Sequence, residues 1–199
     1  MAYGMVIDLK KCVGCHACHV SCKAANGTPP GVTRARVVRE DKGKYPDVKR
    51  TIVPMLCMQC EKPPCVAQCP VGATKKDDDG VVSMDLEKCI GCKACIAACP
   101  YEARYFIENN KGYFGDNLNP FETSAYVEAR VGAVDKCDFC KGNGRLERGE
   151  QPACVSACIV GARVFGNLED LQDLIKSRNG FQLLPEKGTN PSVYYLPAE

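Results

Sequence analysis

The sequence predicts an α+β fold in which two small cysteine-rich modules, made from a duplicated motif, carry hairpin insertions and are followed by a C-terminal helix and an extended tail. Three observations lead to this prediction: sixteen cysteines fall into four consecutive groups, the groups resemble one another in pairs, and turn and strand signals separate them. The groups are Cys12, Cys15, Cys18, Cys22; Cys57, Cys60, Cys65, Cys69; Cys89, Cys92, Cys95, Cys99; and Cys137, Cys140, Cys154, Cys158.

Groups one and three, numbered in chain order, have the spacing C-x2-C-x2-C-x3-C. In bacterial ferredoxins this spacing lets three thiolates hold one 4Fe-4S cluster while the fourth reaches a neighbouring cluster. Groups two and four instead combine a C-x2-C pair, a spacer and the sequence P-x-C-V-x2-C. No cysteine is left over, so the four groups predict four 4Fe-4S clusters with all sixteen cysteines as iron ligands.

Disulfides and zinc are the other uses that so many cysteines allow. Disulfides are disfavoured because the N-terminus, MAYGMVIDLKKC, has no signal-peptide h-region, and because cysteine pairs three residues apart suit metal-thiolate loops. Two four-thiolate zinc sites, each built from two C-x2-C pairs, would use eight thiols and leave the other eight idle. Iron-sulfur ligation is the interpretation that employs every cysteine.

A duplication organises the chain, because DLKKCVGCHAC (Asp8–Cys18) recurs as DLEKCIGCKAC (Asp85–Cys95). In all four groups the last two cysteines are four residues apart. One helical turn would place both on the same face, about 6 Å apart along the axis, so that one short helix supplies a thiolate to each of two clusters. Pro70 and Pro100 should end the helices of groups two and three, whereas groups one and four have no proline at that place.

Two hairpins are predicted between the groups. Gly31–Met55 contains strand-like runs on either side of a turn. A second hairpin follows group two and consists of Ala73–Lys76, a turn at Asp77–Gly80 and the segment VVSMD. The acidic turn is not a calcium loop, because Lys75 and Leu86 would occupy positions that require oxygen ligands.

Two further segments lie outside the cysteine groups. Tyr101–Asp135 has no cysteine, is rich in aromatic residues and lacks clear periodicity, which is typical of functional or partner-bound insertions. After group four, Asn167 should cap a helix, and an extended tail follows it. The apolar face of that helix consists of Leu168, Leu171, Leu174 and Ile175. This C-terminal part either covers the chain's own core or contacts a partner.

The other residues exclude several functions. The net charge is only +2, from 26 basic and 24 acidic side chains, so the chain lacks a nucleic-acid footprint. There is no G-x-G-x-x-G or Walker A motif for a nucleotide cofactor, and no apolar run reaches the roughly 18 residues of a membrane span. With every thiol committed to iron, neither a thiol nucleophile nor an open iron position is left, and we expect outer-sphere electron transfer without a catalytic site.

Four lysines flank the repeated groups one and three: Lys11, Lys23, Lys88 and Lys93. Positive charge near a cluster and hydrogen bonds to its sulfurs raise its reduction potential. The alternative is that these lysines form a solvated basic surface. The sequence is compatible with both interpretations.

A combination of motifs carries a specific resemblance: the order of four groups, the x2-x4-x3 spacing of group two, the 13-residue spacer between Cys140 and Cys154, and phrases such as YPDVKR, CVAQCPVGAT and CIGCKACIAACPY. Over Met5–Leu196 the chain resembles the four-cluster electron-transfer subunit of the dimethyl sulfoxide reductase superfamily of molybdopterin oxidoreductases. This superfamily includes polysulfide, thiosulfate, tetrathionate and respiratory arsenate reductases. The resemblance is specific for the type of subunit and not for the substrate.

The resemblance implies that the groups pair crosswise, each cluster taking three cysteines from one group and the fourth from another. The implied ligand sets are Cys12, Cys15, Cys18 with Cys158; Cys137, Cys140, Cys154 with Cys22; Cys57, Cys60, Cys65 with Cys99; and Cys89, Cys92, Cys95 with Cys69. Residues 1–30 and 131–166 would form one ferredoxin-like module and residues 50–105 the other. Residues 31–49 and 106–130 would be insertions, and residues 167–199 a tail that contacts a partner.

By the same resemblance, the first module would face a large catalytic subunit with a molybdenum or tungsten pterin, and the second a quinone-side membrane subunit or a soluble carrier. The chain would relay electrons between them. A free polyferredoxin, or the equivalent subunit of a hydrogenase or formate dehydrogenase complex, is the alternative. Because we expect no signal peptide or transmembrane segment, the chain would be cytoplasmic, or periplasmic if exported with a partner that carries a twin-arginine signal.

Overall fold

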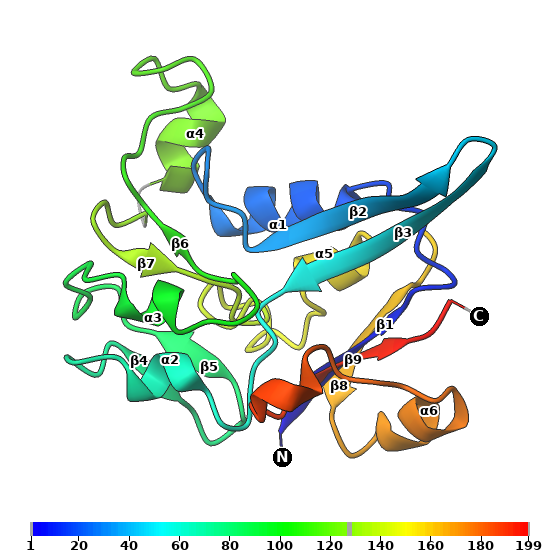
Figure 1. Cartoon of the computed structure of the whole chain (residues 1–199). Coiled ribbons are helices and arrows are strands. Elements are labelled where there is room, and N and C mark those ends of the chain that lie inside the picture. The colour runs from blue at the N-terminus through cyan, green and yellow to red at the C-terminus, as the bar shows by residue number, and fades with distance from the viewer. Residues whose placement is uncertain (1, 127–128, 199) are drawn as a thin grey trace.

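A three-stranded sheet joins the beginning of the chain to its end (Figure 1). The computed structural model describes residues 2–126 and 129–198. In it, β1 (Tyr3–Asp8) is the central strand, with β8 (Arg163–Asn167) antiparallel on one side and β9 (Val193–Leu196) parallel on the other. Met5 of β1 lies opposite Phe165 and Val193. The predicted α+β fold with two small cysteine-rich modules is confirmed.

Strand β1 has the sequence of a strand buried on both faces. Met5, Val6 and Ile7 form a continuous apolar run, and each is at most 1% exposed. A strand buried on both faces reads as such a run rather than as an alternation of polar and apolar residues. Met5 and Ile7 pack in the main core, whereas Val6 packs under the C-terminal helix.

Two pairs of short helices carry the cysteines. Helix α1 (Ala17–Asn26) packs against α5 (Ala153–Ser156), and α2 (Pro64–Ala67) packs against α3 (Ala94–Ala97). The Ser21 hydroxyl of α1 donates to the Ala153 carbonyl of α5 at 3.2 Å. The structure therefore brings group one beside group four, and group two beside group three.

The helices are shorter than predicted, because only α1 contains both of its cysteines. In α2, α3 and α5 the chain leaves the helix before the second cysteine, through hydrogen bonds to the carbonyl three residues back. These bonds run from Cys69 N to Val66 O at 3.1 Å, from Cys99 N to Ile96 O at 3.2 Å, and from Cys158 N to Val155 O at 3.0 Å. Since Ile159 follows Cys158, this tightening of the last turn does not require proline.

Both predicted hairpins are present. Strands β2 (Ala35–Lys44) and β3 (Asp47–Leu56) form a long antiparallel arm that projects from the body in Figure 1. The second hairpin, β4 (Thr74–Lys76) and β5 (Val82–Met84), is short. Its acidic turn has a structural partner, because Lys141 Nζ lies 2.8 Å from Asp77 Oδ2 and 2.6 Å from Asp79 Oδ2. The turn thus ties group two to the loop of group four.

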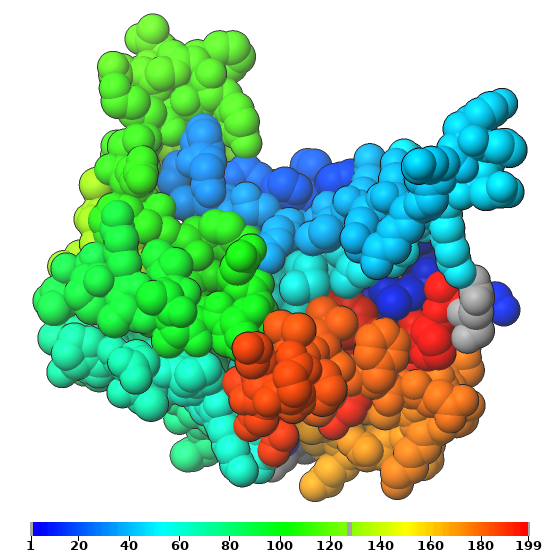
Figure 2. All heavy atoms as spheres, in the orientation of Figure 1, coloured from blue at the N-terminus to red at the C-terminus, as the bar shows by residue number. Residues whose placement is uncertain are grey.

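The insertion after group three forms a lobe closed by two strands. Strands β6 (Tyr105–Phe106) and β7 (Val134–Asp135) pair at its base, and α4 (Pro120–Ala125) lies within it. The Asn119 side chain caps α4 in a capping box with Glu122. Figure 2 shows this lobe and the β2–β3 arm as two projections with a hollowed edge between them.

The C-terminal helix begins later than predicted. Asn167 is the last residue of β8, and its carbonyl accepts hydrogen bonds from the amides of Asp170 and Leu171 in a turn. Helix α6 therefore runs only over Gln172–Ser177. The predicted apolar face is correct: Leu171 and Ile175 are buried, and Leu168 and Leu174 pack beside them. After the short 3-10 helix η2 (Pro185–Lys187), the chain returns as β9, in which every residue but Tyr194 is buried. Much of the C-terminal part therefore covers the chain's own core.

Candidate iron-sulfur centres

Three small cavities are each lined by four cysteines, three from one group and one from the group that the fold places beside it. Set I is Cys12, Cys15, Cys18 and Cys158. Set III is Cys57, Cys60, Cys65 and Cys99. Set IV is Cys69, Cys89, Cys92 and Cys95. Each combination unites cysteines that the resemblance places on one cluster.

The remaining four cysteines, set II, gather in the interior. Set II is Cys22, Cys137, Cys140 and Cys154, and all four are buried. The Asn26 amide Nδ2 lies 3.6 Å from Cys22 Sγ and 3.8 Å from Cys140 Sγ, so it reaches sulfurs of two groups. Electrostatic interactions link Cys137 to both Cys22 and Cys154. Every predicted ligand thus lies near the other three of its implied set.

Left-handed backbone shapes the loops of the repeated groups. In group one Gly14 and His16 have φ values of 66° and 63°, and in group three Gly91 and Lys93 have values of 70° and 61°. These are equivalent positions of the duplicated motif. At Gly91 a Cβ atom would collide with the Gly132 carbonyl oxygen, so glycine is required there for space as well as for conformation. The loop can then turn its thiols toward one cavity.

Backbone amides donate to several of the sulfurs. The amides of Ala162, Val134 and Phe139 lie 3.2, 3.5 and 3.5 Å from the sulfurs of Cys158, Cys89 and Cys137, respectively. Such donors stabilise negative charge on thiolate. They are also among the features that set the reduction potential of an iron-sulfur cluster.

Burial opposes ionisation of the inner thiols. It raises the pKa of Cys60 to about 12 and also raises the pKa of Cys22 and Cys137. Cys69, which is half-buried, behaves differently, because backbone hydrogen bonds from Thr74 and Val71 outweigh its burial and lower its pKa. A metal that binds thiolate must displace the proton, so the inner sets need a strongly bound cationic centre to be ionised.

An unpartnered buried nitrogen fits a negatively charged group in the cavity of set III. Arg104 lines this cavity and is 4% exposed, and its Nη2 atom has no hydrogen-bond partner among the residues that the structure describes. A buried guanidinium nitrogen without an acceptor is costly. Thiolate or sulfide sulfur in the cavity would supply the acceptor, and the donor set therefore fits an iron-sulfur cluster.

Arg104 and Arg163 are the notable residues that the sequence analysis missed. Both lie between cysteine sets, and each follows the last cysteine of a group by five residues in the related tails CPYEAR and CIVGAR. That repetition was the available signal. Two lysines expected beside the clusters have other contacts: Lys23 Nζ donates to the carbonyls of Thr28, Pro29 and Val32, and Lys93 Nζ lies 3.9 Å from the centre of the Phe106 ring.

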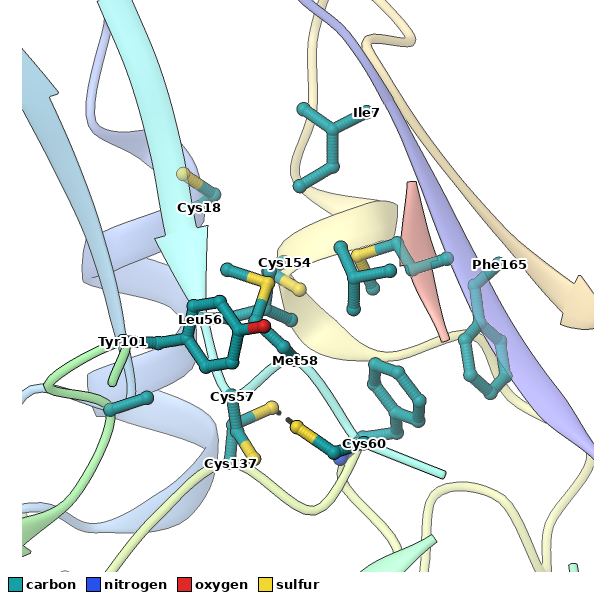
Figure 3. Close-up of a cluster of buried hydrophobic side chains, with 14 of the residues drawn as sticks. Ile7, Cys18, Leu56, Cys57, Met58, Cys60, Tyr101, Cys137, Cys154 and Phe165 are labelled. Carbon is teal, nitrogen blue, oxygen red and sulfur yellow. Dashed lines mark hydrogen bonds between the residues drawn. The ribbon is translucent and has the colours of Figure 1, made fainter. Parts of the chain in front are cut away.

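Sets II and III meet where the two modules join. Figure 3 shows Cys57, Cys60 and Cys137 directed into the same part of the core, and Cys57 and Cys137 interact electrostatically. Gln59, which is 0% exposed, bridges the junction. Its Nε2 donates to the Cys137 carbonyl at 2.8 Å, and its Oε1 accepts from the Val82 amide at 2.7 Å.

Two other features, a site for a single metal ion and a membrane-spanning helix, are absent from residues 2–126 and 129–198. In this part of the molecule no three His, Cys, Asp or Glu side chains converge as ligands of a single metal ion would. Nor does any helix within it combine the length and apolar character needed to cross a membrane.

Family models match the region that holds the first three groups. Residues 48–114 match a model described as a 4Fe-4S dicluster domain, and residues 11–73 match a second model with the same description. Together the two matches run from the start of group one to beyond group three. Both describe clusters of the type that the cysteine spacing predicts.

Several relatives are similar over almost the whole chain. A selenate reductase subunit of Mesobacillus selenatarsenatis is 43% identical, over 96% of this chain and 70% of the relative. The arsenate respiratory reductase iron-sulfur subunit of Shewanella sp. is 38% identical, over 98% and 96%. A polysulfide reductase chain of Wolinella succinogenes is 36% identical, over 98% and 94%. These relatives are parts of reductases that act on different substrates.

Proposed function

This protein belongs to the 4Fe-4S dicluster family and is an iron-sulfur electron-transfer subunit of the dimethyl sulfoxide reductase superfamily. On this basis, we propose a route by which electrons pass through the chain. In this proposal sets I to IV hold one 4Fe-4S cluster each. The observation that carries it is the crosswise lining of the cavities, in which three sulfurs come from one group and the fourth from its neighbour. Bound at these sets, the clusters supply one-electron redox centres.

The order of the sets along the molecule is I, II, III, IV. Arg163 links sets I and II, because it donates to Cys18 and Cys154. Cys137 and Cys57, which belong to one buried core cluster, link sets II and III. Arg104 lines the cavity of set III and contacts Met84, which lines the cavity of set IV. Electrons would enter at one end of this row and leave at the other.

The exposure of single cysteines supports the two ends as entry and exit points. Cys15 of set I and Cys92 of set IV are exposed, and they occupy equivalent positions in the duplicated motif. All cysteines of set II are buried, and set III has three buried cysteines and one half-buried one. A row with buried middle centres and accessible ends exchanges electrons with two different partners.

This chain would therefore contain no catalytic site. Cysteine would fill the protein-supplied position at every iron, so no iron would be open to a substrate, and the chemistry would reside in a partner's cofactor. We propose a large subunit with a molybdenum or tungsten pterin at one end, and a membrane subunit or a soluble carrier at the other. The modules would comprise residues 1–30 with 131–166, and residues 50–105.

The hollowed edge between the two projections is suited to contact with a large subunit (Figure 2). Tyr113 and Phe114 of the lobe are 66% and 74% exposed, and Tyr45 at the tip of the arm is 93% exposed. Exposed aromatic residues are enriched in protein interfaces. In the C-terminal tail, Phe181 and Leu184 would contact the partner, because these side chains are partly exposed whereas β9 is internal.

Anaerobic purification of the chain with its native partners tests this function. We expect roughly sixteen iron and roughly sixteen acid-labile sulfide per chain, almost no zinc, and a pterin-containing large subunit in the same complex. Iron at or below about eight per chain after reconstitution would contradict the four-cluster assignment. A monodisperse, fully loaded monomer that reduces a soluble acceptor without a partner would instead indicate a free polyferredoxin.

A further inference from the structure

We propose that Arg104 and Arg163 are matched internal counter-charges, one in each module, and that each raises the reduction potentials of both clusters in its module. The inference rests on the proposed function, because it takes sets I to IV as cluster ligands. It assigns a role to two residues that are not ligands. They are positioning residues for electron transfer, since they act on the potentials and not on a substrate.

Arg163 is buried among sulfurs of two different sets. It is 4% exposed, and it is the first residue of β8, which fixes its backbone in the central sheet. Its Nη2 lies 3.6 Å from Cys18 Sγ of set I, and its Nη1 lies 3.7 Å from Cys154 Sγ of set II. The two nitrogens of one guanidinium are therefore divided between two cysteine sets, and they would lie beside the two clusters that these sets would hold.

Arg104 occupies the corresponding place in the second module. It is also 4% exposed, and its Nη1 donates to the Thr74 hydroxyl at 3.2 Å. It lines the cavity of set III, and its Nη1 also lies 3.6 Å from the sulfur of Met84, which lines the cavity of set IV. Its other terminal nitrogen, Nη2, is one of two buried side-chain nitrogens without a hydrogen-bond partner among the described residues, the other being Nη1 of Arg130. This arginine too lies between two sets.

The absence of carboxylates makes these two cations unusual. The ion pairs recorded within the described residues involve other arginines, such as Arg34, which is paired with Asp135 and Asp138. A buried charge without a counter-ion is strongly unfavourable. Thiolate-ligated clusters, which are anionic and become more negative on reduction, would provide the missing negative charge.

The duplication places one arginine in each module. Five residues after the last cysteine, groups three and four have Arg104 and Arg163, whereas groups one and two have Gly27 and Thr74. Crosswise pairing combines one group of each kind in each module. A second arginine at Thr74 would compete for the space that Arg104 already fills, because the Thr74 hydroxyl accepts its hydrogen bond.

A cation shared by two clusters acts on both of them. It stabilises the reduced form of each, which raises both potentials. Because both potentials shift in the same direction, a single electron can still pass between the two centres of a module, with no bond made or broken.

Redox titration of the purified complex, followed by electron paramagnetic resonance, tests the inference. Arg163→Met should lower the potentials of the clusters at sets I and II and leave those at sets III and IV unchanged, and Arg104→Met should do the reverse. Arg163→Lys and Arg104→Lys, which keep the charge, should give smaller shifts. Signals are assigned with Cys158→Ser for set I and Cys69→Ser for set IV.

Arg148→Met is the matched control, because Arg148 is exposed and paired with Glu150. It should leave all four potentials unchanged. If a Met variant loses iron, the corresponding Gln variant keeps a hydrogen-bond donor without charge and provides the same comparison. The inference alone would be overturned if all four clusters were present but the uncharged variants left their potentials unchanged. It would also be overturned if Arg148→Met shifted the potentials by the same amount. Fewer than four clusters in the unmodified complex would overturn it together with the proposed function.

Discussion

At the scale of single residues, the last cysteine of group one lies among the cysteines of group four, and the last cysteine of group four lies among those of group one. Cys22 lies in α1 but faces set II, and Cys158 follows α5 but lines the cavity of set I. Sequence order alone would assign each to its own group. The helix pair α1 and α5 is what exchanges them.

Serine substitutions should reveal this exchange. Cys22→Ser should alter the same paramagnetic signal as Cys140→Ser, because both sulfurs belong to set II. Cys158→Ser should alter the same signal as Cys15→Ser, which belongs to set I. The measurement is electron paramagnetic resonance of the reduced complex, with iron content as the control for loading. A common signal for Cys22→Ser and Cys15→Ser would contradict the crosswise assignment.

Residue types that have one dominant role could be predicted from the sequence, and those without one could not. Sixteen cysteines at ferredoxin spacing indicate metal ligation wherever they fold. Arginine is usually exposed, so the repeated tails marked Arg104 and Arg163 as equivalent positions but did not indicate that these side chains are 4% exposed. These arginines are buried because helices that are distant in sequence pack against each other. Only the structure shows which helices pair.

At the scale of elements, hairpins were easier to predict than helix ends. The β2–β3 and β4–β5 hairpins follow from strand-forming runs around strong turn signals. The helices that hold the cysteines proved shorter, because a tightened last turn carries the second cysteine out of the helix. Asn167 had the sequence of a helix cap, but pairing with β1 placed it at the end of a strand.

Strand β9 should be essential for stability, although it lies close to the C-terminal end of the sequence. Tyr195 is 0% exposed, and its hydroxyl donates to the Pro54 carbonyl of β3 at 2.8 Å. Tyr195→Phe should cost about 1 kcal/mol through loss of this hydrogen bond, and Tyr195→Ala about 3–5 kcal/mol through the added cavity. The free energy of unfolding of the loaded protein measures both.

Tyr45→Ala provides the control for those substitutions, since Tyr45 is 93% exposed at the tip of the arm. It should leave the stability of the isolated chain nearly unchanged. If Tyr195→Ala were as stable as Tyr45→Ala, β9 would not be part of the core that we describe.

At the scale of the whole molecule, the junction between the modules is held by buried polar contacts as well as by packing. Gln59→Leu would leave the Val82 amide without its partner, whereas the Cys137 carbonyl would keep its hydrogen bond from Lys136 Nζ. We expect a loss of about 1–3 kcal/mol for the buried amide left unsatisfied, with all four clusters still bound. Thermal loss of the visible absorbance of the clusters would measure it, with the exposed Gln151→Leu as control. Equal stability of the two variants would contradict this role of Gln59.

The central claim is that four clusters form one row, each held by cysteines from two groups. An anomalous difference map at the iron edge, from crystals of the anaerobically purified complex, tests it most directly. We predict four separate iron-sulfur densities, at sets I, II, III and IV in that order, with Cys22 bound to the cluster of Cys137, Cys140 and Cys154. Density that places Cys12, Cys15, Cys18 and Cys22 on one cluster would contradict the account.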